Sequence, residues 1–145
     1  MLQSIKNSLK EKYPSPLKMD NLSILDAQIH FDPDSSNNEL SISIKKDVKI
    51  NKGYIYNGVV TLTTELHSEN DSAYIKVVCC GKFSVAIDNL SEQIVEMLIE
   101  KNSIAIMFPY IRSYISSITS IPNMLPIVLP PINVNKLIED QERNK

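Results

Sequence analysis

The first half of the chain alternates apolar and polar residues in short runs, a pattern typical of half-buried β-strands. Four runs rich in residues that suit a pleated sheet are separated by polar turns, at residues 25–31, 40–45, 54–66 and 73–87. The segments between them carry the Asp, Asn, Ser, Pro and Gly residues that favour turns. Because connections this short join antiparallel strands, we predict a four-stranded antiparallel meander sheet.

The fourth run is apolar on both faces. One face carries Ile75, Val77 and Cys79, and the other carries Tyr74, Val78 and Cys80. A strand that is apolar on both sides is covered on both sides, so we expect helices on one face and another subunit on the other. The adjacent cysteines point to opposite faces, which favours two small buried side chains over a shared metal or a disulfide. We expect Gly81 and Lys82 to form a bulge or bend.

The second half predicts helices. The run Asn-Leu-Ser-Glu at residues 89–92 resembles a capping box before an apolar helix that ends near residues 102–103. A second helix has Phe108, Ile111, Ile115 and Ile118 at helical spacing, with Pro109 in or near its first turn. A short last helix with Leu137 and Ile138 follows, capped by either Asn133 or Asn135.

Residues 121–131 contain four prolines, which exclude a helix or a central strand. The residues between the prolines are nevertheless apolar: Met124, Leu125, Ile127, Val128 and Leu129. An extended loop of this composition is unusual, because loops normally lie at the surface.

Together these elements indicate an α+β fold, a sheet followed by two to three helices on one face. The 145 residues fit one domain. We expect residues 1–20 to be an N-terminal extension and residues 139–145 a charged tail.

The composition, 43% apolar and 22% charged, is that of a globular protein, and a net charge of −2 disfavours a nucleic-acid binder. The lysines at positions 45, 46, 49 and 52 are better explained as a solvated strand end. No secretory signal or apolar run long enough to span a bilayer is visible, so we expect a cytoplasmic protein. Residues 1–12 are a frayed helix or, alternatively, a peripheral membrane segment.

Catalytic and cofactor motifs are missing from the sequence. Three glycines build no phosphate-binding loop, and no His-x-x-x-His or Cys-x-x-Cys spacing indicates a metal. His30 and His67 lie in or beside strands without a nucleophile at a telling spacing. We therefore expect no enzyme activity, no metal and no cofactor.

Two motifs resemble the SecB family of protein-export chaperones. The run Met-Phe-Pro-Tyr-Ile-Arg at residues 107–112 is similar to the Phe-Pro-Tyr-x-Arg opening of that family's long helix. The run Leu-Pro-Ile-Val-Leu-Pro-Pro-Ile-Asn-Val at residues 125–134 is similar to its Pro-rich crossover loop. A looser likeness covers residues 73–86, with the glycine break at Gly81. The resemblance extends from about residue 22 to residue 137.

The resemblance implies a homo-oligomer, a dimer of dimers, that holds non-native polypeptides in apolar grooves without ATP. The implied client-binding residues are Ile42, Ile44, Met124, Leu125, Ile127, Val128, Leu129 and Ile132. The implied oligomer interface comprises Tyr74, Val78, Cys80, Phe108, Ile111 and Ile115. Asp32 matches one carboxylate through which the family docks on the SecA motor, whereas Gln28 and Lys76 depart from that pattern, so we expect weak SecA binding.

Several alternatives stay open. Leu125, Ile127 and Leu129 either line a client groove or plug the domain's own core. Phe108, Ile111 and Ile115 fit a core as well as an interface. The client is either any non-native polypeptide or one dedicated partner, such as the antitoxin of a toxin–antitoxin pair. Outside chaperones, the alternative is a ligand-binding α+β oligomer.

Overall fold

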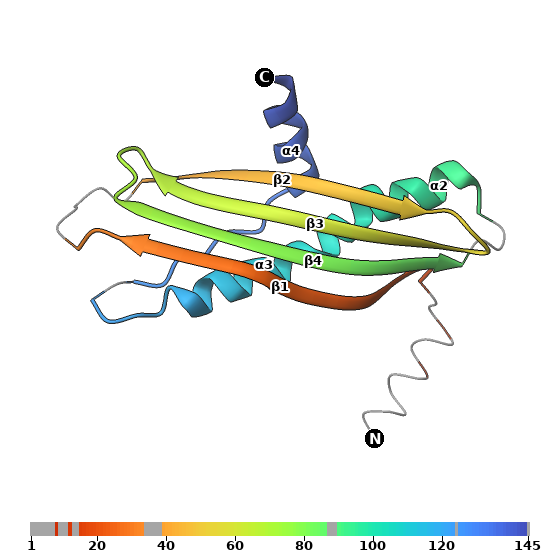
Figure 1. The fold of residues 1–145 in the computed structure, drawn as a ribbon, viewed down its shortest axis with the longest axis horizontal. Helices are drawn as coiled ribbons and strands as arrows, with labels where there is room; N and C mark the ends of the chain where they lie inside the picture. The colour runs from red at the N-terminus through yellow and green to blue at the C-terminus, as the bar shows by residue number, and fades with distance from the viewer. Residues whose placement is uncertain are drawn as a thin grey trace.

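The computed structural model describes residues 8, 12, 15–33, 39–86, 90–123 and 125–144. Its sheet contains β1 (Leu17–Phe31), β2 (Leu40–Asn51), β3 (Ile55–Ser68) and β4 (Ala73–Ala86), all antiparallel to their neighbours. The strand order is β1-β4-β3-β2, visible in Figure 1. The predicted α+β fold with a four-stranded antiparallel sheet is confirmed.

The predicted meander is correct for β2, β3 and β4 but wrong for β1, which pairs with β4 and not with β2. The hairpin-linked strands β2, β3 and β4, with β1 paired to β4, form a Greek key. The connection between β1 and β2 is longer than a tight hairpin turn, so it does not force those two strands to pair.

Two register shifts interrupt β1, between Met19 and Asn21 and between Ile24 and Asp26. The second shift lies beside Leu25, which is exposed although it continues the alternation that predicted the strand. The bulge expected at Gly81 is absent from the described pairing, because β4 keeps a regular register with β3 there. Gly81 is needed for space instead, since an added Cβ would lie 2.7 Å from the Phe83 ring and 3.0 Å from the Met107 sulfur.

The helix after the sheet is continuous through α2 (Glu92–Met97), a π-helical turn η1 (Leu98–Asn102) and α3 (Ser103–Ile118). The predicted cap is confirmed, because the Ser91 hydroxyl accepts a hydrogen bond from Ile94 N at 3.2 Å. The predicted break at residues 102–103 is wrong: the chain widens into η1 and the Ser103 hydroxyl donates to Ile99 O. Pro109 therefore lies inside α3, where the proline ring provides no N–H for the carbonyl of Ala105; both residues are on the exposed side of the helix.

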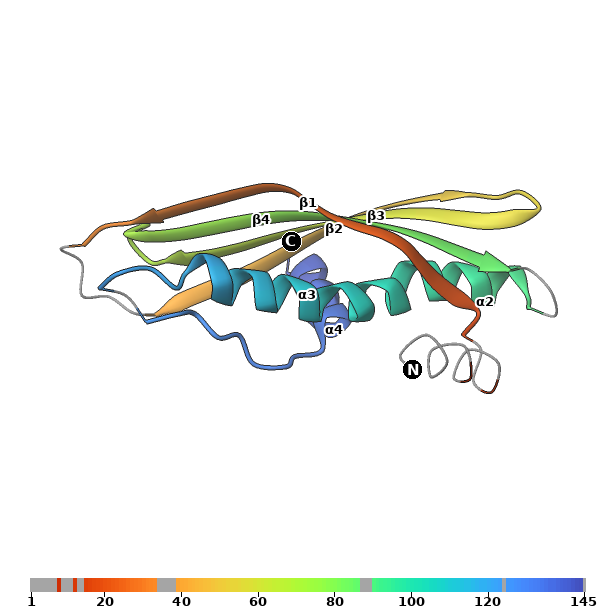
Figure 2. The same ribbon diagram turned by 90° about the horizontal axis from the view of Figure 1, so that it is seen from below.

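The helices all lie on one face of the sheet, as Figure 2 shows. The core forms between that face and η1–α3, and its fully buried members include Val60, Leu62, Ile75, Val77, Phe83, Ile99, Ile104, Met107, Ile111 and Ile115. Burial of each such side chain stabilises the fold by about 1.5–3 kcal/mol. In the described part of the chain, no helix is both long enough and apolar enough to cross a membrane.

The last helix, α4 (Val134–Arg143), packs against β2 and α3. Of the two predicted caps it uses Asn133, whose side chain accepts a hydrogen bond from Lys136 N at 3.1 Å. Residues 139–143, expected in a charged tail, are part of this helix, and β1 begins within the expected N-terminal extension. The buried residues of α4, Val134 and Ile138, hold this charged end of the chain against β2 and α3.

Candidate polypeptide-binding site

Polar side chains of α3 and of its C-cap residue Thr119 hold the backbone of the Pro-rich segment, residues 120–133, at Ile127 and Leu129. Thr119 Oγ1 accepts from Ile127 N at 2.8 Å, and Ser116 Oγ donates to Ile127 O at 2.9 Å. Arg112 Nε donates to Leu129 O at 3.1 Å. Residues 112, 116 and 119 are spaced by four and three, so they project from one side of the helix. All three bonds go to backbone atoms, which leaves the side chains of the segment available for other contacts.

The side chains of the Pro-rich segment divide between two environments. Ile127 and Leu129 are half-buried and pack against the core. Leu125 is 88% exposed and Val128 is 74% exposed. The predicted core plug therefore describes Ile127 and Leu129, and the predicted client contact remains a prediction for the exposed residues Leu125 and Val128. Met124 lies outside the described residues, and Ile132 is partly exposed.

A cavity of about 310 Å³ lies where the end of the Pro-rich segment meets α3. It is lined by Ala105, Phe108, Pro109, Arg112 and residues 131–135. Apolar surface beside a few polar groups is typical of sites that bind apolar side chains. Phe108 contributes to this lining although it is otherwise buried.

The two client-binding residues predicted on β2 differ in accessibility. Ile42 is half-buried, whereas Ile44 is only 1% exposed. Ile44 faces the helices opposite Thr64, and the Gln141 side chain of α4 is hydrogen-bonded to its backbone. In this chain Ile44 is a core residue, and its side chain is not accessible to a client.

The residues predicted for the oligomer interface also separate into two groups. Phe108, Ile111 and Ile115 are buried in the core of the single chain, so they leave no surface for a partner. Tyr74, Val78 and Cys80 lie half-buried on the face of β4 away from the helices. Their cross-strand neighbours there are polar: Ser23, Asp26, His30, Thr61, Thr63 and His67. These neighbours favour a solvated outer face, not the second subunit that we expected there.

The structure shows exposed apolar residues that the sequence analysis missed. Ile24 and Ile29 lie opposite Cys79 and Ile75, on the face of β1 that carries the helices, yet both stay exposed. Exposed apolar side chains also follow the long helix: Ile94, Met97, Ile106 and Tyr110. The spacing of three between positions 94 and 97, and of four between 106 and 110, was a sequence signal for an apolar stripe. The π-helical turn between the two pairs changes the direction in which the second pair projects, so a regular helical period does not connect them.

The two cysteines and Asp32 are titratable groups singled out by the sequence, and the structure places all three. Burial raises the pKa of the Cys79 thiol to about 11, so this thiol stays protonated near neutral pH. Cys79 and Cys80 are free and lie on opposite faces of β4, as predicted. Among the described residues, no three His, Cys, Asp or Glu side chains are grouped as metal ligands. Asp32 is exposed at the end of β1, where its backbone N–H donates to Ser72 O at 2.7 Å.

Comparison with known families and sequences gives two findings. Residues 21–145 match the model of the family described as preprotein translocase subunit SecB. An uncharacterized protein of Methanocaldococcus jannaschii is 32% identical over 110 residues, which covers 73% of this chain and 70% of that protein.

Two solved structures share the fold. A SecB-like chaperone of Mycobacterium tuberculosis, in complex with a ChAD peptide from an antitoxin, has a TM-score of 0.58 at 13% identity; the match covers 87% of this chain and 98% of that chain. A protein of unknown function from Streptococcus agalactiae has a TM-score of 0.51 at 9% identity, with 79% and 97% covered. At these identities the likeness concerns the fold.

Proposed function

The chain belongs to the SecB family, and on that premise we propose that it is an ATP-independent chaperone that holds non-native polypeptides on the Pro-rich segment. Its role is to bind, and no catalytic step is assigned to it. The free cysteines suit a reducing compartment, and we place the protein in the cytoplasm as a single domain.

The observation that carries the proposal is the exposure of Leu125 and Val128 on an anchored backbone. Burying either side chain against a client would contribute about 1.5–3 kcal/mol. Because Arg112, Ser116 and Thr119 already order the segment, a client does not bear the entropic cost of ordering it. The neighbouring cavity offers space for an apolar client side chain.

We also propose that the protein is a homo-oligomer, assembled through the exposed apolar residues of β1 and the long helix. We choose this surface, and not the outer face of β4, because it carries exposed apolar side chains: Ile24, Ile29, Ile106 and Tyr110. Light scattering at micromolar concentration is expected to give the mass of a dimer or of a dimer of dimers. Introducing negative charge with Ile106→Glu and Tyr110→Glu is expected to dissociate it, and Tyr74→Glu is expected to leave it intact.

We propose two classes of client: a broad range of non-native proteins or one dedicated antitoxin. The structure of the M. tuberculosis chaperone is the reason for including the antitoxin. That chaperone is in complex with an antitoxin peptide, so a dedicated antitoxin client is a specific alternative to a broad range of non-native proteins. For the SecA motor we propose weak binding, because Gln28 and Lys76 face each other across β1 and β4 where acidic docking groups were expected. Titration with purified SecA tests this, and nanomolar binding would contradict it.

The proposal is tested by Leu125→Glu combined with Val128→Glu. We expect at least a tenfold loss of affinity for an unfolded model client such as reduced α-lactalbumin, with unchanged oligomer mass and unfolding midpoint. The matched control is Tyr54→Glu with Ile55→Glu, an exposed apolar pair at the β2–β3 turn. In Figure 1 that turn lies at the opposite end of the sheet from the start of the Pro-rich segment. Equal losses in both variants, or no loss in either, would refute the site.

A further inference from the structure

The first turns of the long helix carry apolar side chains that stay exposed. Ile94 is 43% exposed and Met97 is 47% exposed, whereas Val95, Leu98 and Ile99 in the same turns are buried in the core. Ile94 and Met97 lie three positions apart, so they share one side of the helix, away from the core. We call these two side chains the α2 stripe. The π-helical turn separates the stripe from the exposed pair further along the helix that we assigned to the oligomer.

Acidic side chains accompany the α2 stripe. Three glutamates are spaced by four along this stretch, at Glu92, Glu96 and Glu100. Lys52 pairs with the first two, and the nearby Lys101 pairs with Glu139 of α4. Glu100 is exposed and has no ion pair within the described part of the chain. Because Glu100 follows Met97 by three positions, an unpaired carboxylate lies within one turn of the stripe.

The beginning of the chain has the complementary composition. Leu2, Ile5 and Leu9 are spaced by three and four, which places them on one side of a helix. Lysines occupy positions 6, 10 and 12, against a single glutamate at position 11. Of residues 1–14 the structure describes Ser8 and Lys12, and both are helical and exposed, as expected for polar positions of an amphipathic helix. This segment therefore combines an apolar side with positive charge, the two properties that fit the α2 stripe.

The connection to β1 holds this segment within reach of α2. Prolines at positions 14 and 16 end a helix before β1 begins at Leu17. Leu17 pairs with Val85, next to the last residue of β4, and α2 begins six residues after β4 ends. Figures 1 and 2 both show the start of β1 at the same end of the sheet as α2. A helix of twelve residues is about 18 Å long, which is enough to cover a stripe of one turn.

We propose that residues 1–13 form an amphipathic helix that docks on the α2 stripe of the same chain. Its apolar side covers Ile94 and Met97, and its lysines lie near Glu100. The docked helix keeps this apolar surface from contact with other polypeptides. The surface is distinct from the client site, so the inference stands or fails independently of the proposed function.

The size and the charge of the stripe favour this occupant over a separate molecule. A stable complex of two proteins buries about 1,200–2,000 Å², far more than two half-exposed side chains provide. A tethered segment needs less area, because a short linker gives it an effective concentration of about millimolar. A second copy of α2 would bring glutamates against glutamates, and such like-charge contacts are unfavourable.

The docking is tested by tryptophan fluorescence, because the chain contains no tryptophan. Met97→Trp places a single indole on the stripe of the full-length protein. Adding Ile5→Ser with Leu9→Ser is expected to about double the acrylamide quenching constant of that indole, because the apolar cover is lost. An unchanged quenching constant would overturn the docking.

The matched control for the serine pair is Gln3→Ser with Asn7→Ser, which has the same spacing on the opposite side of the helix. This control should leave the quenching constant unchanged, and a rise equal to that of the first pair would also overturn the docking. Ile94→Trp repeats the measurement at the other residue of the stripe, so the result does not depend on one substitution.

Cross-linking distinguishes the chain's own segment from other occupants. In a Cys80→Ser background, Leu9→Cys with Met97→Cys is expected to oxidise to a disulfide within one chain, whereas Gln3→Cys with Met97→Cys is not. Cys79 does not interfere, because it is fully buried. A covalent dimer would assign the stripe to a second copy. Protection of the indole that requires vesicles of phosphatidylglycerol and phosphatidylcholine would assign the segment to a membrane surface. Either result would refute the proposal, and neither affects the client site.

Discussion

Two connections in this molecule order their backbones by opposite means. The turn between β3 and β4, residues 69–72, is held by its own side chains, whereas the Pro-rich segment, residues 120–133, is held by side chains of α3. Both satisfy backbone groups with side-chain oxygens or nitrogens. They differ in how far along the chain the partners lie.

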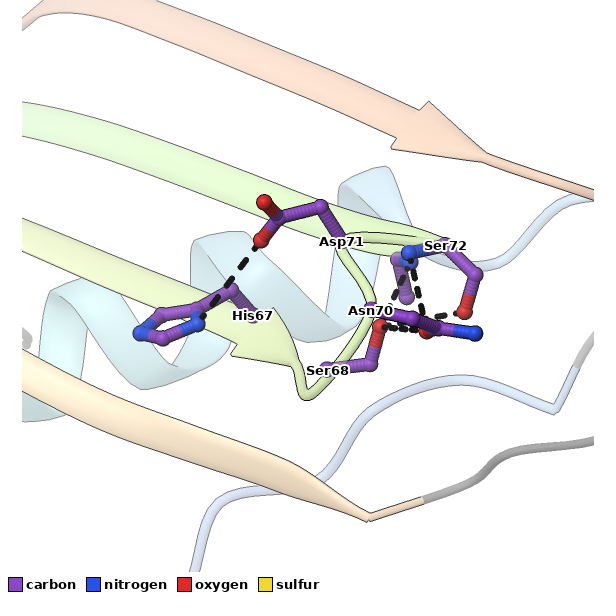
Figure 3. A network of polar contacts seen from close by, with 6 residues as sticks. His67, Ser68, Asn70, Asp71 and Ser72 are labelled. Carbon is purple, nitrogen blue, oxygen red and sulfur yellow. Dashed lines mark hydrogen bonds and ion pairs between the residues drawn. The ribbon is translucent and has the colours of Figure 1, made fainter.

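In the β3–β4 turn, the side-chain hydrogen bonds join residues at most five positions apart, and one backbone bond, from Asp32 N to Ser72 O, ties the turn to the end of β1. Ser68 Oγ accepts from Ala73 N at 3.0 Å, and Asn70 Oδ1 accepts from Ser72 N at 3.2 Å. Figure 3 shows the side chains of Ser68, Asn70 and Ser72 gathered in this turn. Asp71 N donates to Ser68 O at 3.1 Å. Local bonds of this kind form as soon as the turn forms, so the side-chain ordering of the turn does not require α3 or the Pro-rich segment.

In the Pro-rich segment, the bonds to Ile127 and Leu129 come from residues 8 to 17 positions away. The segment acquires its shape only when α3 is formed and docked. A binding surface built this way has a defined backbone and exposed side chains, whereas the side-chain bonds of the β3–β4 turn are local. Variants in each region test this difference.

The largest effect is expected from removing the anchors on α3. Arg112→Met, Ser116→Ala and Thr119→Val together delete three hydrogen bonds to the segment and should lower the free energy of unfolding by about 2–4 kcal/mol. Hydrogen exchange at Ile127 should accelerate more than at core amides. The control is Ser113→Ala with Ser117→Ala, two exposed serines on the other side of α3. Equal urea midpoints for the triple variant and the wild type would mean that apolar packing alone holds the segment.

A smaller effect is expected in the turn. Ser68→Ala leaves the Ala73 N–H without the acceptor that it has now and should cost about 1–2 kcal/mol, because Ser68 is buried. Chemical denaturation measures the loss. Client binding at the Pro-rich segment should stay unchanged, since the turn is independent of that segment. A parallel fall in client affinity would show that the two regions are coupled.

Each region contains one residue with a positive φ, which sharpens the comparison further. Asp71 has φ 55° in the turn, and Asn123 has φ 63° in the Pro-rich segment. Replacement of either by alanine should cost about 1 kcal/mol, because Asp and Asn tolerate the left-handed region better than alanine does. Glycine at the same positions should change the stability by less than alanine. A glycine variant that is less stable than its alanine counterpart would mean that the side chain, and not the backbone conformation, matters there.

The smallest effect is expected outside both regions, at the exposed ion pairs of Lys52 with Glu92 and with Glu96. The hydrogen bond from Lys52 lowers the pKa of Glu92, so the stabilisation is present above the unfolded-state pKa of Glu92 and lost as the pH falls through the folded-state value. The same contacts raise the pKa of Lys52, so its contribution is lost only in strongly alkaline solution. Lys52→Met should lower the urea midpoint slightly at pH 7 and not at pH 2. Added salt should shrink the difference.

Much of the fold was readable from residue order. The alternation at residues 40–45 predicted β2, and Ser91 predicted the start of α2. The start of α4 was predicted at either Asn133 or Asn135, and the structure uses Asn133. The prolines predicted that residues 121–131 are neither helix nor central strand. Each of these features depends on backbone preferences and hydrogen bonds within a few residues, which is the information that a single sequence carries directly.

The arrangement of these elements was decided by contacts between distant residues. The pairing of β1 with β4, the widened turn that carries the helix past residue 102, and the need for Gly81 beneath Met107 all depend on what lies opposite in space. So does the candidate site, where α3 decides that Ile127 faces the core and that Leu125 faces solvent. The sequence by itself determined which segments are strands, helices and loop, because those preferences are local. Only the tertiary structure decided which apolar residues form the core and which remain exposed to bind, because burial belongs to the packed chain and not to any residue within it.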